Sequence, residues 1–78
     1  MTQATIATTE TQLTPRQNDV ARLIAQRGMS NQAIADYLEL SICTVKIHVS
    51  TVFEKYRVKN RAQLVLAYNN NGRLPTFN

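Results

Sequence analysis

Apolar side chains recur every three to four residues in three consecutive segments of the chain, which is the spacing of helices that each bury one face, and a fourth segment rich in apolar residues follows them. In the first two segments the inward positions are Val20, Leu23 and Ile24, followed by Ile34, Ala35 and Leu38. In the third and longest they are Ile42, Val45, Val49, Val52 and Tyr56. No segment has the strict alternation of a strand, so the pattern predicts an all-α, four-helix domain.

Capping residues predict where these helices begin and end. Thr14 is an N-cap followed by Pro15 at the first helical position, and Gln17 completes a capping box. Gly28 ends this helix in the left-handed conformation. The other predicted bounds are Ser30 as the cap of a second helix of about two turns, Ser41 as the cap of a third from Ile42 to about Tyr56, and Asn60 with Gln63 as the cap of a fourth from Arg61 to about Asn69. A short helix, a turn and a longer basic helix give the outline of a helix-turn-helix.

A chain of 78 residues holds one small domain, which favours a binding module over a deep catalytic cleft. The net charge of +4 favours an anionic partner such as nucleic acid or an acidic surface. One histidine, one cysteine and few carboxylates offer no nucleophile and base pair, no metal-ligand cluster and no glycine-rich phosphate loop. The sequence therefore predicts a protein that is not an enzyme and uses no cofactor or metal.

The two ends of the chain differ in composition from the predicted helices. Residues 1–12 are rich in Thr, Gln and Ala and predict a flexible, disordered tail, whereas Gly72 and Pro75 indicate a second tail at 71–78 after a domain at 13–70. Neither a signal peptide nor an apolar run of about 20 residues occurs. Together with the single cysteine, this predicts a protein of the cytoplasm without a membrane partner.

The third predicted helix has a second face, whose chemistry differs from that of its buried stripe. Its positions are Cys43, Lys46, Ile47, Ser50 and Glu54. The slender side chains near the helix N-terminus fit a DNA major groove, where Lys46 can donate to guanine or phosphate and Ile47 can pack on thymine methyl groups. The alternative interpretation of Ile47 is an ordinary exposed aliphatic residue.

Polar and basic side chains border this face. Thr44 and His48 lie one turn apart, where they can donate to phosphates. The alternatives are a first-turn capping bond for Thr44 and a half-buried imidazole bonded to a backbone carbonyl for His48. A basic cluster at the junction of the third and fourth helices predicts further backbone contacts, or else a solvated charged surface. It consists of Lys55, Arg57, Lys59 and Arg61.

Four motifs follow one another at fixed spacing: "LTPRQ" at 13–17, "SNxxIAxxL" at 30–38, "TVKxHxxxVxxK" at 44–55 and "VxNR" at 58–61. With them, residues 13–67 resemble the DNA-binding domain of the LuxR/FixJ-type transcription regulators, a four-helix helix-turn-helix that the GerE-like regulators carry in stand-alone form. A sigma-factor region 4 shares the "IAxxL" and "TVK" elements, but the continuation "KIHVSTVFEK" and the "VKNR" that follows favour the LuxR type.

The resemblance implies that the third helix is the recognition helix. It implies that Lys46, Ile47 and Ser50 occupy the family's base-reading positions. It also implies that Thr44 and His48 lie near phosphates. Ser30 and Asn31, at the start of the second helix, are implied to approach a phosphate with free N–H groups. The fourth helix is implied to form a homodimer that places two recognition helices about 34 Å apart over an inverted repeat. The implied dimer contacts are Gln63, Val65, Leu66 and Asn69.

The chain departs from the family pattern at several positions. The family commonly has Glu where this chain has Gln17, basic residues where it has Gln32, Ser50 and Glu54, and Gly where it has Arg57. Several of these departures remove phosphate contacts or add repulsion, which lowers the affinity for DNA and flattens its salt dependence, so this surface is expected to bind DNA less tightly than the family pattern implies. Arg57 is expected to adopt the left-handed conformation that favours glycine.

The predicted function is that of a small stand-alone transcriptional regulator, bacterial or phage-encoded, that binds double-stranded DNA as a homodimer. The sequence predicts no receiver or ligand-binding domain ahead of the helix-turn-helix, and regulation is then expected from expression level, oligomerisation or a partner protein. The alternative is an antagonist that uses the same scaffold to pair with a larger transcription regulator or a host factor.

Overall fold

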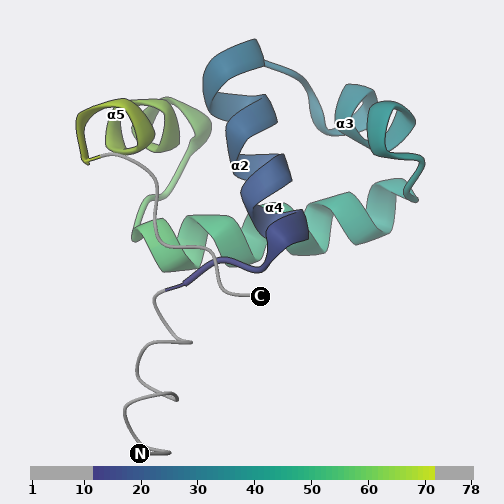
Figure 1. The fold of residues 1–78 in the computed structure, drawn as a ribbon, viewed down its shortest axis with the longest axis horizontal. Helices are drawn as coiled ribbons and strands as arrows, with labels where there is room; N and C mark the ends of the chain where they lie inside the picture. The colour runs from purple at the N-terminus through teal and green to yellow at the C-terminus, as the bar shows by residue number, and fades with distance from the viewer. Residues whose placement is uncertain (1–11, 72–78) are drawn as a thin grey trace, which may run out of the picture.

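The computed structural model describes residues 12–71, which form the four helices labelled α2 to α5 in Figure 1. Their bounds are α2 Pro15–Arg27, α3 Asn31–Leu38, α4 Ile42–Tyr56 and α5 Arg61–Asn71. The predicted four-helix, all-α fold is confirmed, and α5 continues past its predicted end near Asn69. The predicted tails at 1–12 and 71–78 lie outside the described residues, apart from Gln12 and Asn71.

The predicted N-caps are formed by short side-chain bonds to the first turn of each helix. At α2 the capping box is complete, because the Gln17 N–H donates to Thr14 Oγ1 and the Thr14 N–H donates to Gln17 Oε1, both at 3.1 Å. The other caps accept a backbone N–H three residues on: Ser30 from Ala33 at 3.1 Å, Ser41 from Thr44 at 3.0 Å and Asn60 from Gln63 at 2.9 Å. These local bonds fix where α3 and α4 begin.

Helices α2, α3 and α4 each end at a residue in the left-handed conformation. Gly28 does so at a φ of 62°, as predicted, and Arg57 at 59°. Glu39 ends α3 at a φ of 58°, which the sequence pattern did not indicate. Non-glycine residues pay a steric cost in this region, so Glu39 and Arg57 are local sources of strain.

Replacing Arg57 by glycine is expected to stabilise the domain. In the left-handed conformation an L-residue costs roughly 1–2 kcal/mol, and glycine avoids this cost. Part of the gain is offset because glycine loses more conformational entropy on folding. We expect a net gain of about 0.5–1 kcal/mol, which raises the melting temperature by roughly 3–6 °C in a domain of this size. Thermal unfolding followed by circular dichroism measures the shift.

Lys59→Gly is the matched control, because Lys59 is exposed in the same turn and its φ is not positive. It removes the same charge and adds the same glycine without relieving strain. A melting temperature that rises equally in both variants would contradict the assignment of strain to Arg57.

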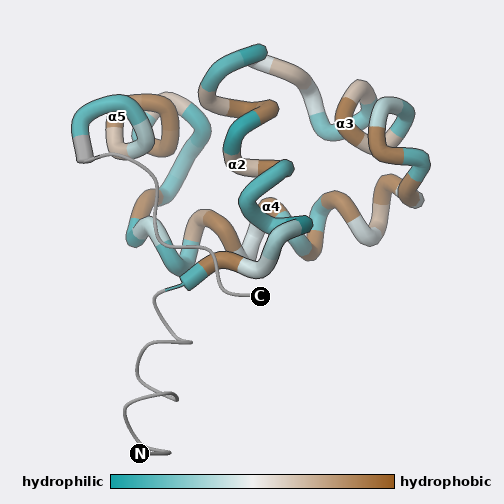
Figure 2. Tube along the Cα trace, in the orientation of Figure 1, coloured by the Kyte–Doolittle hydropathy of each residue, from teal (hydrophilic) through white to brown (hydrophobic). Residues whose placement is uncertain are grey.

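The core lies where α2 crosses α4, with α3 packed at the N-terminal end of α4 and α5 near its C-terminal end (Figure 1). Apolar and polar positions alternate along the helices in Figure 2. The buried apolar residues are Leu13, Val20, Ala21, Leu23, Ile24, Ile34, Ala35, Val45, Val49, Val52, Leu64 and Tyr68. The predicted stripes supply most of this core, while Leu38, Ile42 and Tyr56 pack half-buried at its edge.

Candidate nucleic-acid interface

One arc of α4 is left without a covering helix among the described residues (Figure 1). Lys46, Ile47 and Ser50 lie on it, and all three are exposed. The Ile47 side chain is 65% exposed, whereas Val45 and Val49, two positions before and after it on the other side of the helix, are buried. The predicted division of α4 into a buried stripe and an outward arc is therefore present. Cys43 and Glu54 are exposed on the same arc.

Thr44 and His48 lie half-buried along one border of this arc. The Thr44 N–H donates to Ser41 Oγ at 3.0 Å, and the Ser41 hydroxyl donates to Thr44 Oγ1 at 2.9 Å. The predicted first-turn capping bond thus exists. It occupies an acceptor site of the Thr44 hydroxyl and leaves its proton free to donate, so the capping role and a phosphate contact are compatible.

The N-terminus of α3 presents unpaired backbone donors. Ser30 Oγ accepts the N–H of Ala33, and within residues 12–71 no acceptor bonds the N–H groups of Asn31 and Gln32. These donors sit at the positive end of the helix dipole, which favours an anion. The turn between α2 and α3 thus has the chemistry predicted for it.

Arg61 ties the start of α5 to that turn. Its Nη1 donates to the Met29 carbonyl oxygen at 2.8 Å, and its Nη2 donates to Asn31 Oδ1. The sequence predicted Arg61 as a DNA contact, and the structure shows that two of its donors are used inside the domain. Arg61 therefore fixes the orientation of the Asn31 side chain at the N-terminus of α3.

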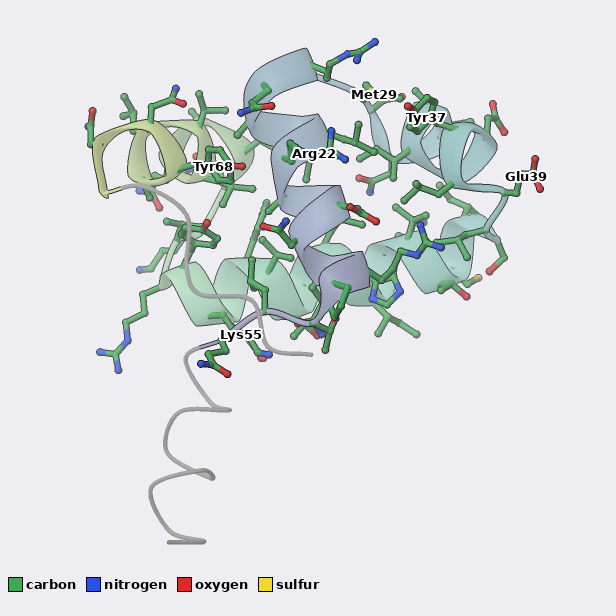
Figure 3. All side chains as sticks on the ribbon, viewed as in Figure 1. Arg22, Met29, Tyr37, Glu39, Lys55 and Tyr68 are labelled. Atoms are coloured by element: carbon green, nitrogen blue, oxygen red, sulfur yellow. The ribbon has the colours of Figure 1, made fainter. Side chains whose placement is uncertain are left out.

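Lys55 makes a comparable long-range contact at the other end of the site. Its Nζ donates to the Gln12 carbonyl oxygen at 2.5 Å and to Gln17 Oε1 at 3.0 Å, across 43 and 38 positions in sequence. In Figure 3 Lys55 lies at the C-terminal half of α4, on the side where the described chain begins. Lys55 thus joins the recognition-helix candidate to the first turn of α2.

Comparison with known proteins decides what kind of domain carries this surface. The model of the bacterial regulatory proteins, luxR family, matches residues 11–68. The chain belongs to the luxR family. The nitrate/nitrite response regulator protein NarL of Escherichia coli K12 is 45% identical over 60 residues, which cover 73% of this chain and 27% of NarL. The response regulator protein VraR of Staphylococcus aureus Mu3 is 44% identical over 54 residues, covering 69% of this chain and 25% of VraR.

The chain thus spans about a quarter of the length of these relatives. The luxR-family assignment confirms the resemblance on which the site prediction depends.

Within residues 12–71, no helix is both long and apolar enough to cross a bilayer. The same residues contain no group of three or more His, Cys, Asp or Glu side chains arranged to hold a metal ion.

The luxR-family helix α5 presents an apolar residue to solvent. Leu66 is 61% exposed, Val65 is half-buried, and Gln63 and Asn69 are exposed. Gln63 is also used within the fold, because its Oε1 accepts the Lys59 N–H at 2.7 Å. The predicted dimer positions are therefore accessible, with Leu66 as the largest apolar side chain among them.

Two features of the site were missed by sequence reasoning. The contact of Lys55 with Gln17 joins residues too distant in sequence for any local pattern to pair them. The contact of Arg61 with the Met29 carbonyl involves a backbone atom, which carries no sequence signal. Covariation of two positions among related sequences is the kind of signal that reveals a side-chain contact such as that of Lys55 with Gln17.

Arg61→Met is expected to lower the free energy of unfolding by about 2 kcal/mol, because hydrogen bonds from a charged donor contribute roughly 1.5–3 kcal/mol. The melting temperature should fall by roughly 10 °C in thermal unfolding. Arg57→Met is the control, since it removes the same charge from an exposed side chain. Equal melting temperatures of the two variants would show that the Arg61 bonds contribute nothing to the fold.

Proposed function

We propose that this luxR-family domain binds double-stranded DNA with α4 in the major groove and thereby regulates transcription in the bacterial cytoplasm. The observation that carries the proposal is the uncovered arc of α4, on which an exposed Ile47 lies beside an exposed Lys46. An aliphatic side chain exposed in this way gains by packing on thymine methyl groups, and its neighbour supplies a donor for guanine or phosphate.

The proposed contacts divide into base reading and backbone positioning. Lys46, Ile47 and Ser50 read base edges, because they are exposed on the arc that enters the groove. Backbone contacts come from the α3 N-terminus at Ser30 and Asn31 and from the border of α4 at Thr44 and His48. Arg61 acts in this scheme as a positioning residue for Asn31, through the bond described above.

We further propose that two copies bind together through α5, with Leu66 and Val65 in the contact and Gln63 and Asn69 at its edge. The exposed Leu66 supports this, because burial of an apolar side chain favours association. A two-fold dimer places its recognition helices about one helical turn of DNA apart, roughly 34 Å, and predicts an operator that is an inverted repeat.

Selection of bound sequences from a random duplex pool tests the proposal. An enriched inverted repeat with half-sites one turn apart supports both DNA reading and the dimer. Lys46→Ala is the control that locates the reading surface, and it should lose the enrichment while remaining folded. A folded wild-type chain that enriches no sequence would contradict the proposal.

A second candidate function is that of an antagonist that pairs with a larger regulator through α5. It is favoured by the charge balance of residues 30–57, where Lys46, Lys55 and Arg57 are offset by Asp36, Glu39 and Glu54. Counterion release grows with the number of phosphates that Lys and Arg neutralise, so a helix-turn-helix with only three such cations gains less affinity from it than a strongly basic one. Affinity capture from a bacterial lysate separates the two functions, since an antagonist retains a stoichiometric protein partner and no DNA.

A further inference from the structure

A stripe of half-buried polar residues runs the length of α4 between its buried face and its outward arc. Its members are Thr44, His48, Thr51 and Lys55. They recur at intervals of four, three and four residues, so they lie on one side of the helix. When a helix enters the major groove, residues on its border meet the phosphate strand and not the bases. The stripe therefore has the position of a line of backbone contacts.

Lys55 is the cation of this stripe, and its ammonium group is held in place by uncharged acceptors. Both acceptors, the Gln12 carbonyl and Gln17 Oε1, are neutral. In the described part of the chain, the ion pairs join Asp19 to Arg16 and Arg22, and none involves Lys55. An ammonium group has three donors, and two bonds leave one N–H for a further acceptor.

Gln17 is itself fixed by the capping box at the start of α2. Its Oε1 accepts both the Thr14 N–H and the Lys55 ammonium, at 3.1 and 3.0 Å. The Lys55 side chain is therefore ordered before any ligand arrives, which reduces the entropy lost on binding. A carboxylate at position 17 would accept the same two bonds, but it would also cancel the positive charge of Lys55.

We infer that Lys55 is a phosphate-binding residue of the α4 border, and that Gln17 is its positioning residue, which orients the ammonium group without neutralising it. The inference rests on the proposed function and deepens it. Its importance follows from the charge balance of the helix-turn-helix, where Lys55 is one of three cations set against three acids between residues 30 and 57. Neutralising Lys55 would leave this unit with an excess of negative charge.

The inference predicts opposite effects of Gln17→Glu on folding and on DNA binding. The new carboxylate forms an ion pair with Lys55 and lies in the first turn of α2, so the melting temperature rises. The affinity for DNA falls about fivefold at low salt, because one phosphate contact is lost from each subunit. The slope of log affinity against log salt flattens by about 0.9 per subunit. A random-sequence duplex pool is a sufficient probe, since phosphate contacts are independent of sequence.

Two controls separate this effect from a general gain of negative charge. Gln26→Glu adds the same charge at an exposed position of the same helix, and it should change the salt slope little. Lys55→Met removes the ammonium group, and in that background Gln17→Glu should no longer flatten the slope. Thermal unfolding of each variant confirms that the binding data come from folded protein.

Each outcome of this experiment has a definite meaning. Equal salt slopes for the wild type, Gln17→Glu and Lys55→Met overturn the inference and leave the proposed function intact. An equal loss in Gln17→Glu and Gln26→Glu also overturns it, because the effect would then be one of net charge. A folded wild type that binds no duplex at low salt overturns the inference together with the proposed function.

Discussion

Leu64→Ala is expected to lower the free energy of unfolding by about 3 kcal/mol. Leu64 is fully buried, with 0% of its surface exposed, and it lies on the helix α5, which packs mainly against α2. Removing its side chain loses the transfer free energy of the buried carbon atoms and leaves a cavity between the helices. A chain of this size has a total stability of roughly 4–12 kcal/mol, so the loss is a large fraction of it.

Urea unfolding followed by circular dichroism measures this loss. Leu66→Ala is the matched control, because it makes the same chemical change two residues away, where the side chain is 61% exposed. At a protein concentration at which the chain is monomeric, we expect the control to change the free energy of unfolding by less than about 0.5 kcal/mol. A control as destabilised as Leu64→Ala would contradict the orientation of α5.

The orientation of α5 also shows where sequence reasoning reached its limit. Leu64, Val65, Leu66 and Tyr68 are all apolar or aromatic, so the hydrophobic pattern does not decide which side of the helix faces the core. Packing against α2 decides it, by burying Leu64 and Tyr68 and leaving Leu66 exposed. That choice depends on the positions of other helices, which a local pattern does not contain.

The helix bounds, by contrast, were predictable because their signals are local. In the Thr14–Gln17 capping box and at the Ser30 and Ser41 caps, each capping bond joins residues three positions apart. The buried stripe of α4, which includes Val45 and Val52, could be predicted from the helical period alone. Because the same period places Lys46 and Ile47 on the opposite side, the outward arc of α4 was also predictable.

The contacts that position the site were not predictable in the same way. Arg61 and Lys55 were both expected on the DNA-facing surface as members of a basic cluster. The structure shows that each is bonded to a residue about thirty or more positions away, to Asn31 and Gln17 respectively. The clustering of positive charge predicted contacts with the DNA backbone for these residues, but it did not indicate which atoms of the domain they contact.

Lys46→Ala is expected to weaken DNA binding by about 10- to 100-fold, which corresponds to roughly 1–3 kcal/mol for the loss of a contact to a base or phosphate. Lys46 is exposed on the uncovered arc of α4, and no hydrogen bond or ion pair holds it to the described residues. Its removal should therefore leave the fold unchanged. The thermal unfolding curves of the variant and the wild type are expected to coincide.

Lys59→Ala is the control for charge, because Lys59 is also exposed but lies in the turn between α4 and α5. It should weaken binding only slightly and equally for all sequences, as expected for a change in the general electrostatic attraction. A similar loss in both variants would indicate attraction by net charge and no dedicated reading surface.

The central claim is that α4 reads DNA, and a fluorescence-anisotropy titration of the folded chain with a labelled duplex at low salt tests it most directly. The duplex is the one enriched from the random pool, and the wild type is compared with Lys46→Ala and Lys59→Ala. The account predicts binding by the wild type and by Lys59→Ala, with a loss of at least about tenfold in Lys46→Ala. Equal affinities of the wild type and Lys46→Ala, or no binding by folded wild-type protein, would contradict it.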